Sequence, residues 1–219
     1  MIRLQTLGSV DLRDSEGREI RSVLAQPKRL ALLSYLAIAS PRGFLRRDQV
    51  LALFWPEQDA EHARAALNRA VYYLRKALGP GVLLSRGDEE IGVCGSGFLC
   101  DAAALQIAVA EGRYRDALEL CRGDLLPGFF ISDAPGFERW LEAERERLRQ
   151  FALRAAWGRA ESEQAAGNIA LALHWARWAV DRAPWDEAGI RRLIVMLLEA
   201  GDRAGAVHAF ERFARRLAD

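Results

Sequence analysis

The sequence predicts a mainly α-helical protein with a small β part. Apolar residues recur at helical spacing through most of the 219 residues, while strand-like segments are confined to the first twenty residues and to residues 82–93. A 34-residue repeat in the second half is a third observation that favours helices. A hydrophobic content of 51% can fill one large core or two smaller ones. We expect two domains, residues 1–97 and residues 98–219.

The front domain is expected to begin with strands and to continue with three helices and a hairpin. The segments IRLQTLG and VDLR read as short strands, and Pro27 suits the first position of a helix. A second helix is expected over Arg46–Phe54 and a third over Ala60–Leu78, with Asp59 as its N-cap. The segments VLLSR and EIGV, separated by Gly87–Glu89, predict a β-hairpin. Three helices followed by a hairpin predict a winged helix-turn-helix.

The third helix has two faces of different character. Its buried face is expected to hold Ala60, Ala63, Leu67, Ala70, Val71, Leu74 and Leu78. Its outward face is expected to hold His62, Ala65, Ala66, Arg69, Tyr72, Tyr73 and Lys76. No Asp or Glu occurs between His62 and Gly87, whereas five basic residues do: Arg64, Arg69, Arg75, Lys76 and Arg86. An acid-free face with arginines and aromatic rings suits a groove lined by phosphates, although a solvated amphipathic helix is the other interpretation.

The second half repeats itself at a period of 34 residues. Gly201 follows Gly167 at this distance, and the same offset relates Ala172 to Ala206 and His174 to His208. A weaker third copy starts at residue 110. Glycine between helices and small residues where paired helices cross are typical of tetratricopeptide repeats. We therefore expect residues 98–219 to form an all-α, tetratricopeptide-like domain, interrupted by one long helix over residues 136–166.

Composition excludes several classes of function. The net charge is +1, so no field of the whole molecule attracts nucleic acid or membrane. Cys94, Cys100 and Cys121 fit neither a disulfide framework nor a metal motif, and we expect them to be small buried residues. No apolar run could span a bilayer and no signal segment is present, which predicts a cytoplasmic protein. Because phosphate-loop, zinc-protease and serine-hydrolase motifs are missing, we expect no enzyme, no cofactor and no metal.

Taken in order, the motifs resemble those of the Streptomyces antibiotic regulatory protein family. The front motifs are IRLQTLG, QPKRLALLSYLA, Leu53-Phe54-Trp55-Pro56, Ala63-Arg64 and Leu74–Leu78. The later ones are Gly123–Gly128, Phe137–Trp140, Glu144-Arg145 and the repeats. This resemblance implies an OmpR-type winged helix followed by a bacterial transcriptional activator domain. It also implies a sequence-specific activator that binds double-stranded DNA at promoter repeats and contacts RNA polymerase.

The same resemblance makes Ala60–Leu78 the helix that reads DNA. Arg69 and Tyr73, with Tyr72 beside them, are then expected to meet base edges in the major groove, and Ala65 and Ala66 to lie against thymine methyl groups. The residues expected to contact phosphates are Arg64, Arg75, Lys76, Arg46 and Arg47. Arg86, in the wing, is expected to reach the neighbouring minor groove.

Two classes of function remain open. In the first, the protein is a transcriptional activator whose helical domain pairs protomers into a homodimer or contacts RNA polymerase. Self-association is expected because a single winged helix makes few base contacts, and two linked copies raise the effective concentration. In the second, the protein is an interaction scaffold whose winged helix no longer binds DNA usefully. The small net charge and the Tyr72-Tyr73 pair favour this alternative.

Overall fold

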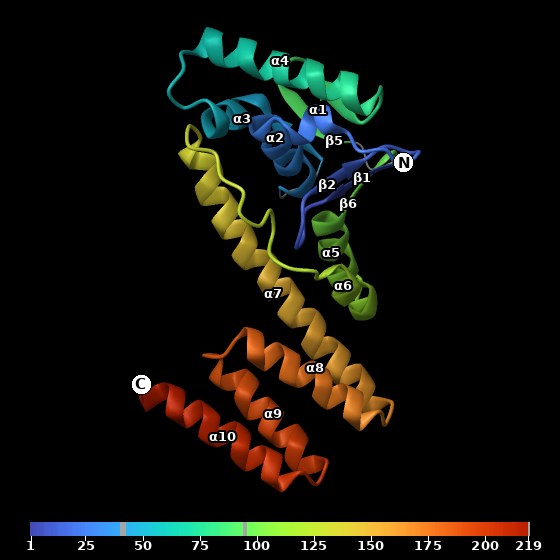
Figure 1. Cartoon of the computed structure of the whole chain (residues 1–219), viewed down its shortest axis with the longest axis vertical. Coiled ribbons are helices and arrows are strands. Elements are labelled where there is room, and N and C mark those ends of the chain that lie inside the picture. The colour runs from blue at the N-terminus through green and yellow to red at the C-terminus, as the bar shows by residue number, and fades with distance from the viewer. Residues whose placement is uncertain (40–42, 94–95, 219) are drawn as a thin grey trace. The chain divides into compact units, whose positions relative to one another are not determined.

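Figure 1 shows the computed structural model of the chain, which describes residues 1–39, 43–93 and 96–218. Contacts divide the chain into two units, each formed from two segments. Unit 1 comprises residues 1–107 and 120–148, and unit 2 comprises residues 108–119 and 149–219. Helix α7 (Pro135–Ala165) contributes its first half to unit 1 and its second half to unit 2. The predicted domain boundary between residues 97 and 98 stays a prediction.

The first sheet of unit 1 joins the start of the chain to residues near 100. Strand β1 (Ile2–Gln5) pairs antiparallel with β2 (Asp11–Arg13) and parallel with β6 (Phe98–Cys100). The buried carboxylate of Asp101, at the start of α5 (Asp101–Ala110), accepts hydrogen bonds from the Thr6 amide at 2.9 Å and the Leu7 amide at 3.0 Å. Only helix was predicted after residue 97, and β6 departs from that expectation. Three residues are too few for an alternating pattern, and pairing with distant β1 forms the strand.

The winged helix-turn-helix is built from four helices and a second three-stranded sheet. The helices are α1 (Arg21–Leu24), α2 (Pro27–Ile38), α3 (Arg47–Phe54) and α4 (Ala60–Leu78). The strands are β3 (Phe44–Arg46), β4 (Leu83–Arg86) and β5 (Glu90–Val93), in the order β3-β5-β4. Helices α2 and α4 and the β4–β5 hairpin confirm the predicted elements. Helix α1 and strand β3 were not predicted, and α3 begins at Arg47, one residue later than expected.

The core of the winged helix is shielded from solvent. Side chains of this core with at most 1% of their surface exposed include Val50, Phe54, Leu67, Leu74 and Ile91. Strands β3 and β5 approach so closely that a Cβ atom on Gly92 would lie 2.4 Å from the carbonyl oxygen of Gly43. Only glycine fits at position 92 without a shift of the backbone.

The first half of α7 packs against the winged helix through an aromatic cluster. The ring of Phe137 lies 5.1 Å from that of Phe54, and the ring of Trp140 lies 4.9 Å from that of Tyr35. Aromatic pairs at such distances contribute about 0.5–1.5 kcal/mol beyond the area that they bury. This cluster explains why unit 1 continues to residue 148, although the sequence placed these residues in the second domain.

Unit 2 consists of paired helices with the same turn between them. It contains α6 (Tyr114–Leu120) up to residue 119, the second half of α7, α8 (Ile169–Arg182), α9 (Glu187–Glu199) and α10 (Arg203–Ala218). Gly112, Gly167 and Gly201 have φ angles of +71°, +78° and +79°. After each glycine, the next amide donates to the carbonyl five residues earlier, at 2.8 Å in all three turns. This glycine C-cap confirms the predicted repeat.

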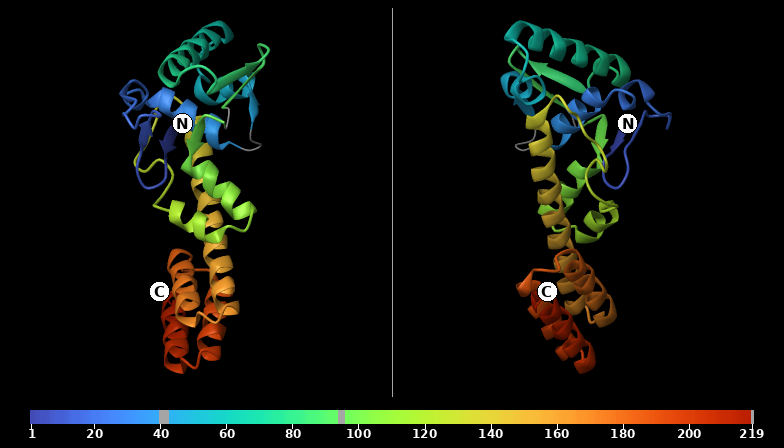
Figure 2. Two further views of the ribbon diagram at one scale, coloured as in Figure 1. Left: turned by 90° about the vertical axis from the view of Figure 1, so that its right-hand side faces the viewer. Right: turned by 60° about the vertical axis from the view of Figure 1, so that its left-hand side comes forward.

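Figure 2 shows α8, α9 and α10 side by side in both views. Small residues lie where these helices cross, and larger apolar side chains fill the space between them. Members of this buried cluster include Ala172, Ala176, Ala206, Ala209, Ile190, Leu193, Leu197 and Phe213.

Candidate nucleic-acid interface

Helix α4 carries most of the predicted site, and its ends are defined by side-chain and backbone caps. The Asp59 carboxylate accepts hydrogen bonds from the amides of Glu61 at 3.1 Å and His62 at 3.0 Å. The hydrogen bond from the His62 amide, followed by that from the His62 ring, holds the pKa of Asp59 below its usual value. The helix ends at Gly79, with a φ angle of +82°, after basic Arg75 and Lys76 in its last turn. Cations at this end complement the helix dipole.

The two faces of α4 agree with the sequence except at Ala60. Ala63, Leu67, Ala70, Val71, Leu74 and Leu78 are buried, as predicted. Ala60 is exposed, so its assignment to the buried face was wrong. It is the first helical residue and precedes the first buried position by one turn.

The outward face of α4 is open to solvent in unit 1. Tyr72 is 61% exposed and Tyr73 is 40% exposed, and their rings meet edge to face at 5.4 Å. Arg69, Lys76 and Ala65 are also exposed, whereas Ala66 is half-buried. Within the described residues, the side chains of Arg69 and Lys76 make no hydrogen bond or ion pair, so their charges face water. Such unpaired cations can meet phosphates or base edges without first breaking an internal contact.

Arg75 is attached to the wing. Its Nε donates to the Leu83 carbonyl oxygen at 3.2 Å, and its Nη2 donates to the Ser85 hydroxyl at 2.9 Å. Both acceptors lie on β4. Arg75 therefore connects α4 to the wing, a contact that the helical wheel could not show.

Arg86, at the end of β4, lies along the sheet. Its guanidinium stacks on the Phe44 ring with 4.2 Å between the Cζ atom and the ring centroid, and it pairs with Glu90 at 3.4 Å. The side chain is nevertheless 68% exposed. It can therefore reach a ligand beside the wing after a change of rotamer.

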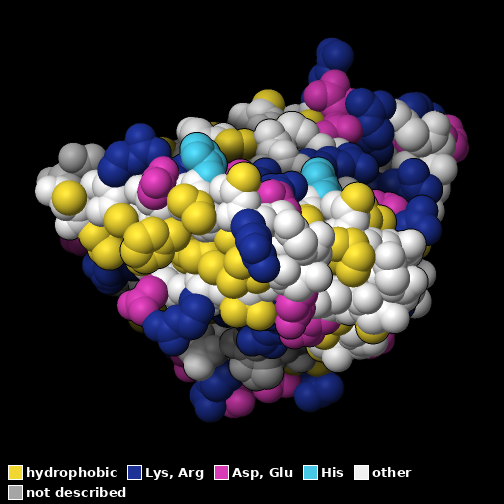
Figure 3. Space-filling view, turned by 90° about the horizontal axis from the view of Figure 1, so that it is seen from below, with side chains coloured by type: hydrophobic (Ala, Val, Ile, Leu, Met, Phe, Trp, Pro, Cys, Tyr) yellow, Lys and Arg dark blue, Asp and Glu magenta, His cyan; other side chains and the backbone are white. Residues whose placement is uncertain are grey.

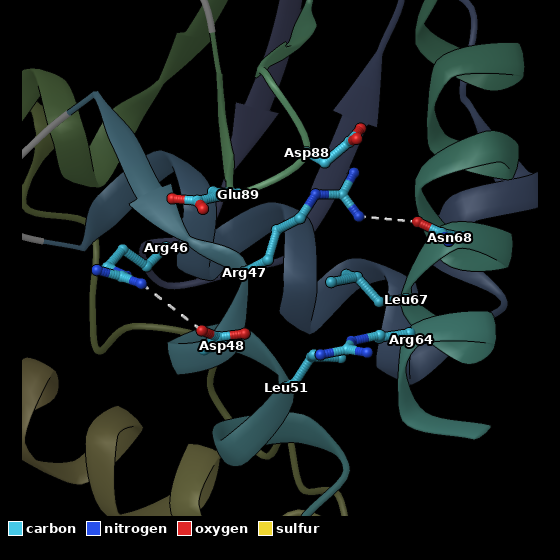
Figure 4. A pocket seen from close by; sticks show the side chains of 9 residues that line it. All are labelled: Arg46, Arg47, Asp48, Leu51, Arg64, Leu67, Asn68, Asp88 and Glu89. Carbon is cyan, nitrogen blue, oxygen red and sulfur yellow. Dashed lines mark hydrogen bonds and ion pairs between the residues drawn. The ribbon is translucent and has the colours of Figure 1, made fainter. Parts of the chain in front are cut away.

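A pocket of about 440 Å³ lies beside α4, between α3 and the turn of the wing (Figure 4). Arg47 extends across it, and its Nη1 donates to the Asn68 carbonyl oxygen Oδ1 at 2.8 Å. Arg46 pairs with Asp48 at 3.7 Å. The arginines and carboxylates that line the pocket are Arg46, Arg47, Arg64, Asp48, Asp88 and Glu89. Three formal positive charges thus face three negative charges.

The first backbone amide of α3 already has a partner within the protein, which was not expected. Arg46 and Arg47 were expected to hold phosphates together with the amides at this helix end. The Arg47 amide instead donates to the Glu89 carbonyl oxygen at 2.8 Å, which ties α3 to the turn of the wing. Among the described residues, the Nε of Arg47 is buried and has no hydrogen-bond partner.

Sequence reasoning missed two residues of this surface. Asn68 accepts the hydrogen bond from Arg47. The guanidinium of Arg29, in α2, lies over the Tyr73 ring with 4.2 Å between its Cζ atom and the ring centroid. One signal for Arg29 was available. A cation in the first turn of a helix opposes the helix dipole, so Arg29 at this position indicates an interaction with another part of the protein or with a ligand.

Comparisons with known proteins agree with this architecture. The sequence model of the bacterial transcriptional activator domain family matches residues 100–219. The chain belongs to this family. It is 28% identical over 202 residues to the regulatory protein AfsR of Streptomyces coelicolor, a match that covers 88% of this chain and 20% of AfsR.

Among solved structures, the chain resembles EmbR of Mycobacterium tuberculosis, determined in complex with a low affinity phosphopeptide. The TM-score is 0.67 at 23% identity, and the match covers 100% of this chain and 60% of the EmbR chain. This likeness confirms the predicted fold class, and the three findings together confirm the resemblance to the Streptomyces antibiotic regulatory protein family. The chain spans a fifth of AfsR, the curated relative that it matches.

The matched family is a domain of bacterial transcriptional activators. Within residues 1–39, 43–93 and 96–218, no group of three metal-binding side chains comes together, and no helix has the length and apolar character to cross a membrane.

Cys100 is buried as predicted, and burial, followed by the charge of Asp101, raises the pKa of its thiol to about 12. Cys121 is half-buried, and Cys94 lies outside the described residues.

Proposed function

We propose that the chain is a sequence-specific, DNA-binding transcriptional activator. The exposed face of α4 carries this proposal: it holds Arg69, Tyr72, Tyr73 and Lys76, and no carboxylate follows Glu61 on this helix. A helix about 10–12 Å across fits the major groove of B-DNA. Residues 1–97 would recognise the duplex, and residues 98–219 would act on the transcription machinery in the cytoplasm.

Individual residues have distinct roles in this proposal. Arg69 can donate two hydrogen bonds to a guanine, and Tyr73 can donate one to a base edge, with Tyr72 against the adjoining sugar. Ala65 and Ala66 border the same face, and half-buried Ala66 offers the smaller contact to a thymine methyl group.

A second group of residues would hold the DNA backbone. Lys76 on the outward face of α4 and exposed Arg64 on the same helix would meet phosphates, as would Arg46 and Arg47 at the start of α3. Arg86 would leave Phe44 to enter the minor groove. Arg75 would do two things at once, since its guanidinium holds the wing and keeps further N–H donors for a phosphate.

Unit 2 is proposed to contact proteins. Figure 3 shows hydrophobic side chains gathered on one face of the molecule. Exposed apolar residues of α9 and α10 are Val195, Leu198, Val207, Phe210 and Leu217. An apolar surface on stacked helical pairs suits a protein partner, which would be RNA polymerase or a second copy of the chain.

One observation favours the alternative function, an interaction scaffold without useful DNA binding. The pocket beside α4 is lined by three carboxylates as well as three arginines, so its charges cancel. The carboxylates Asp88 and Glu89 lie at the turn of the wing, where a phosphate would approach. Repulsion at this turn would weaken binding to any duplex.

Selection of bound duplexes from a random pool, followed by titration at two salt concentrations, distinguishes the two functions. An activator would enrich a motif and bind it more tightly than a scrambled duplex, with affinity falling as salt rises. Retention of no duplex at any salt concentration, together with capture of a protein partner, would establish the scaffold instead.

A further inference from the structure

Arg29 is a cation without a local electrostatic reason for its position. It lies in the first turn of α2, where the helix dipole disfavours positive charge. Its neighbour Lys28 is compensated by Asp133, at 2.6 Å. Among the described residues, no carboxylate pairs with Arg29. In the described part of the chain, its guanidinium makes one hydrogen bond, from Nη1 to the Ser22 carbonyl oxygen at 3.3 Å.

The guanidinium of Arg29 lies over the face of Tyr73. The Cζ atom is 4.2 Å from the ring centroid, which is well within the distance for cation–π attraction. Arg29 itself is half-buried, and the bond to Ser22 of α1 fixes its far end. A guanidinium over the face of an aromatic ring is the commonest form of this contact.

The Tyr73 ring is therefore held from two sides. The Arg29 guanidinium covers one face, and the Tyr72 ring meets the Tyr73 ring edge to face at 5.4 Å and 73°. Tyr73 nevertheless remains 40% exposed to solvent. Its hydroxyl group thus has a set direction before any ligand arrives, and such preorganisation reduces the entropy lost on binding.

We propose that Arg29 is a positioning residue that fixes Tyr73 for sequence-specific contact with DNA. This inference rests on the proposed function. Arg29 acts through Tyr73 rather than as a separate phosphate contact, so its removal lowers the preference for the specific duplex more than the affinity for DNA in general. The two residues then form one energetic unit, and their effects on binding are not additive.

The test is a double-mutant cycle on the full chain. Arg29→Gln removes the guanidinium, Tyr73→Leu removes the ring, and a third protein carries both changes. The matched control is Arg21→Gln, which removes the same charge: Arg21 is 85% exposed on α1 and pairs with Glu19. Each protein is titrated by fluorescence anisotropy with the selected duplex and a scrambled duplex at several salt concentrations.

We expect Arg29→Gln to lower the ratio of specific to scrambled affinity by about two- to fivefold, the range of an exposed cation–π contact, with the same salt slope as Arg21→Gln. In the Tyr73→Leu background the same change should have no further effect, and Arg21→Gln should keep the wild-type ratio of specific to scrambled affinity. Additive losses, an equal loss on both duplexes, or a wild-type ratio in Arg29→Gln would each overturn the inference.

A measurement without DNA separates this inference from the proposed function. In labelled free protein, the Arg29 side-chain protons should show an upfield ring-current shift that disappears in Tyr73→Leu. If the shift is present and the wild type binds no duplex, the proposed function is refuted and the role of Arg29 in DNA recognition falls with it. Absence of the shift overturns the positioning role even if the wild type binds DNA specifically.

Discussion

Arg75 offers the most informative single perturbation, because the structure gives it a role in the wing and the family resemblance gives it a role on DNA. Arg75→Ala removes two hydrogen bonds to β4, at 3.2 Å and 2.9 Å, whereas Ser85→Ala removes only the second. Hydrogen bonds from charged donors contribute about 1.5–3 kcal/mol when buried, and exposure of this side chain reduces their combined effect to about 1 kcal/mol. We expect Ser85→Ala to cost about half as much.

Urea denaturation measures this loss of stability, and duplex titration against salt measures the contact with DNA. If Arg75 also holds a phosphate, Arg75→Ala should flatten the slope of log affinity against log salt by about one unit. Ser85→Ala should leave the slope unchanged. Equal slopes for the two variants and the wild type would refute the phosphate contact. An unfolding free energy unchanged in both variants would refute the tether between α4 and the wing.

Three further predictions concern other parts of the winged helix. Arg69→Ala should lower binding to the selected duplex by about 1–3 kcal/mol and leave binding to a scrambled duplex nearly unchanged, and equal losses on both would remove Arg69 from base recognition. Gly92→Ala should destabilise the fold by about 1–3 kcal/mol in urea, since its Cβ would meet a backbone oxygen, whereas Gly97→Ala, with open space around it, serves as the control. Asp59→Ala should lower the midpoint of thermal unfolding at neutral pH. Because folding lowers the pKa of Asp59, its contribution to stability is complete above the unfolded pKa of about 4 and disappears as the pH falls through the folded pKa. A difference in unfolding midpoint between wild type and Asp59→Ala that persisted in strong acid would contradict this origin.

Much of this fold could be predicted because its signals are local. Asp59 followed by an amphipathic segment predicts a capped helix, and both the cap and the buried stripe are present. The glycines at a 34-residue period predict the repeated turn, since each adopts a positive φ angle that other residues disfavour. Turn residues between VLLSR and EIGV predict the hairpin.

What the sequence did not show depends on distant partners. Strand β3 exists because it pairs with β5, and β6 exists because it pairs with β1, more than ninety residues away in the chain. The packing of Phe137 on Phe54 likewise joins two segments with no local signal in common. In the candidate site, an exposed face could be read from helical spacing. The contacts of Arg75 with β4 and of Arg29 with Tyr73 needed the tertiary structure.

In the proposed function, the outward face of α4 enters the groove of a duplex. Titration of the labelled chain with its selected duplex, followed by amide and side-chain chemical shifts, tests this claim most directly. We expect the largest shift changes at Arg69, Tyr72, Tyr73 and the wing. Changes confined to α8, α9 and α10, or no change at a duplex concentration that saturates binding, would contradict it.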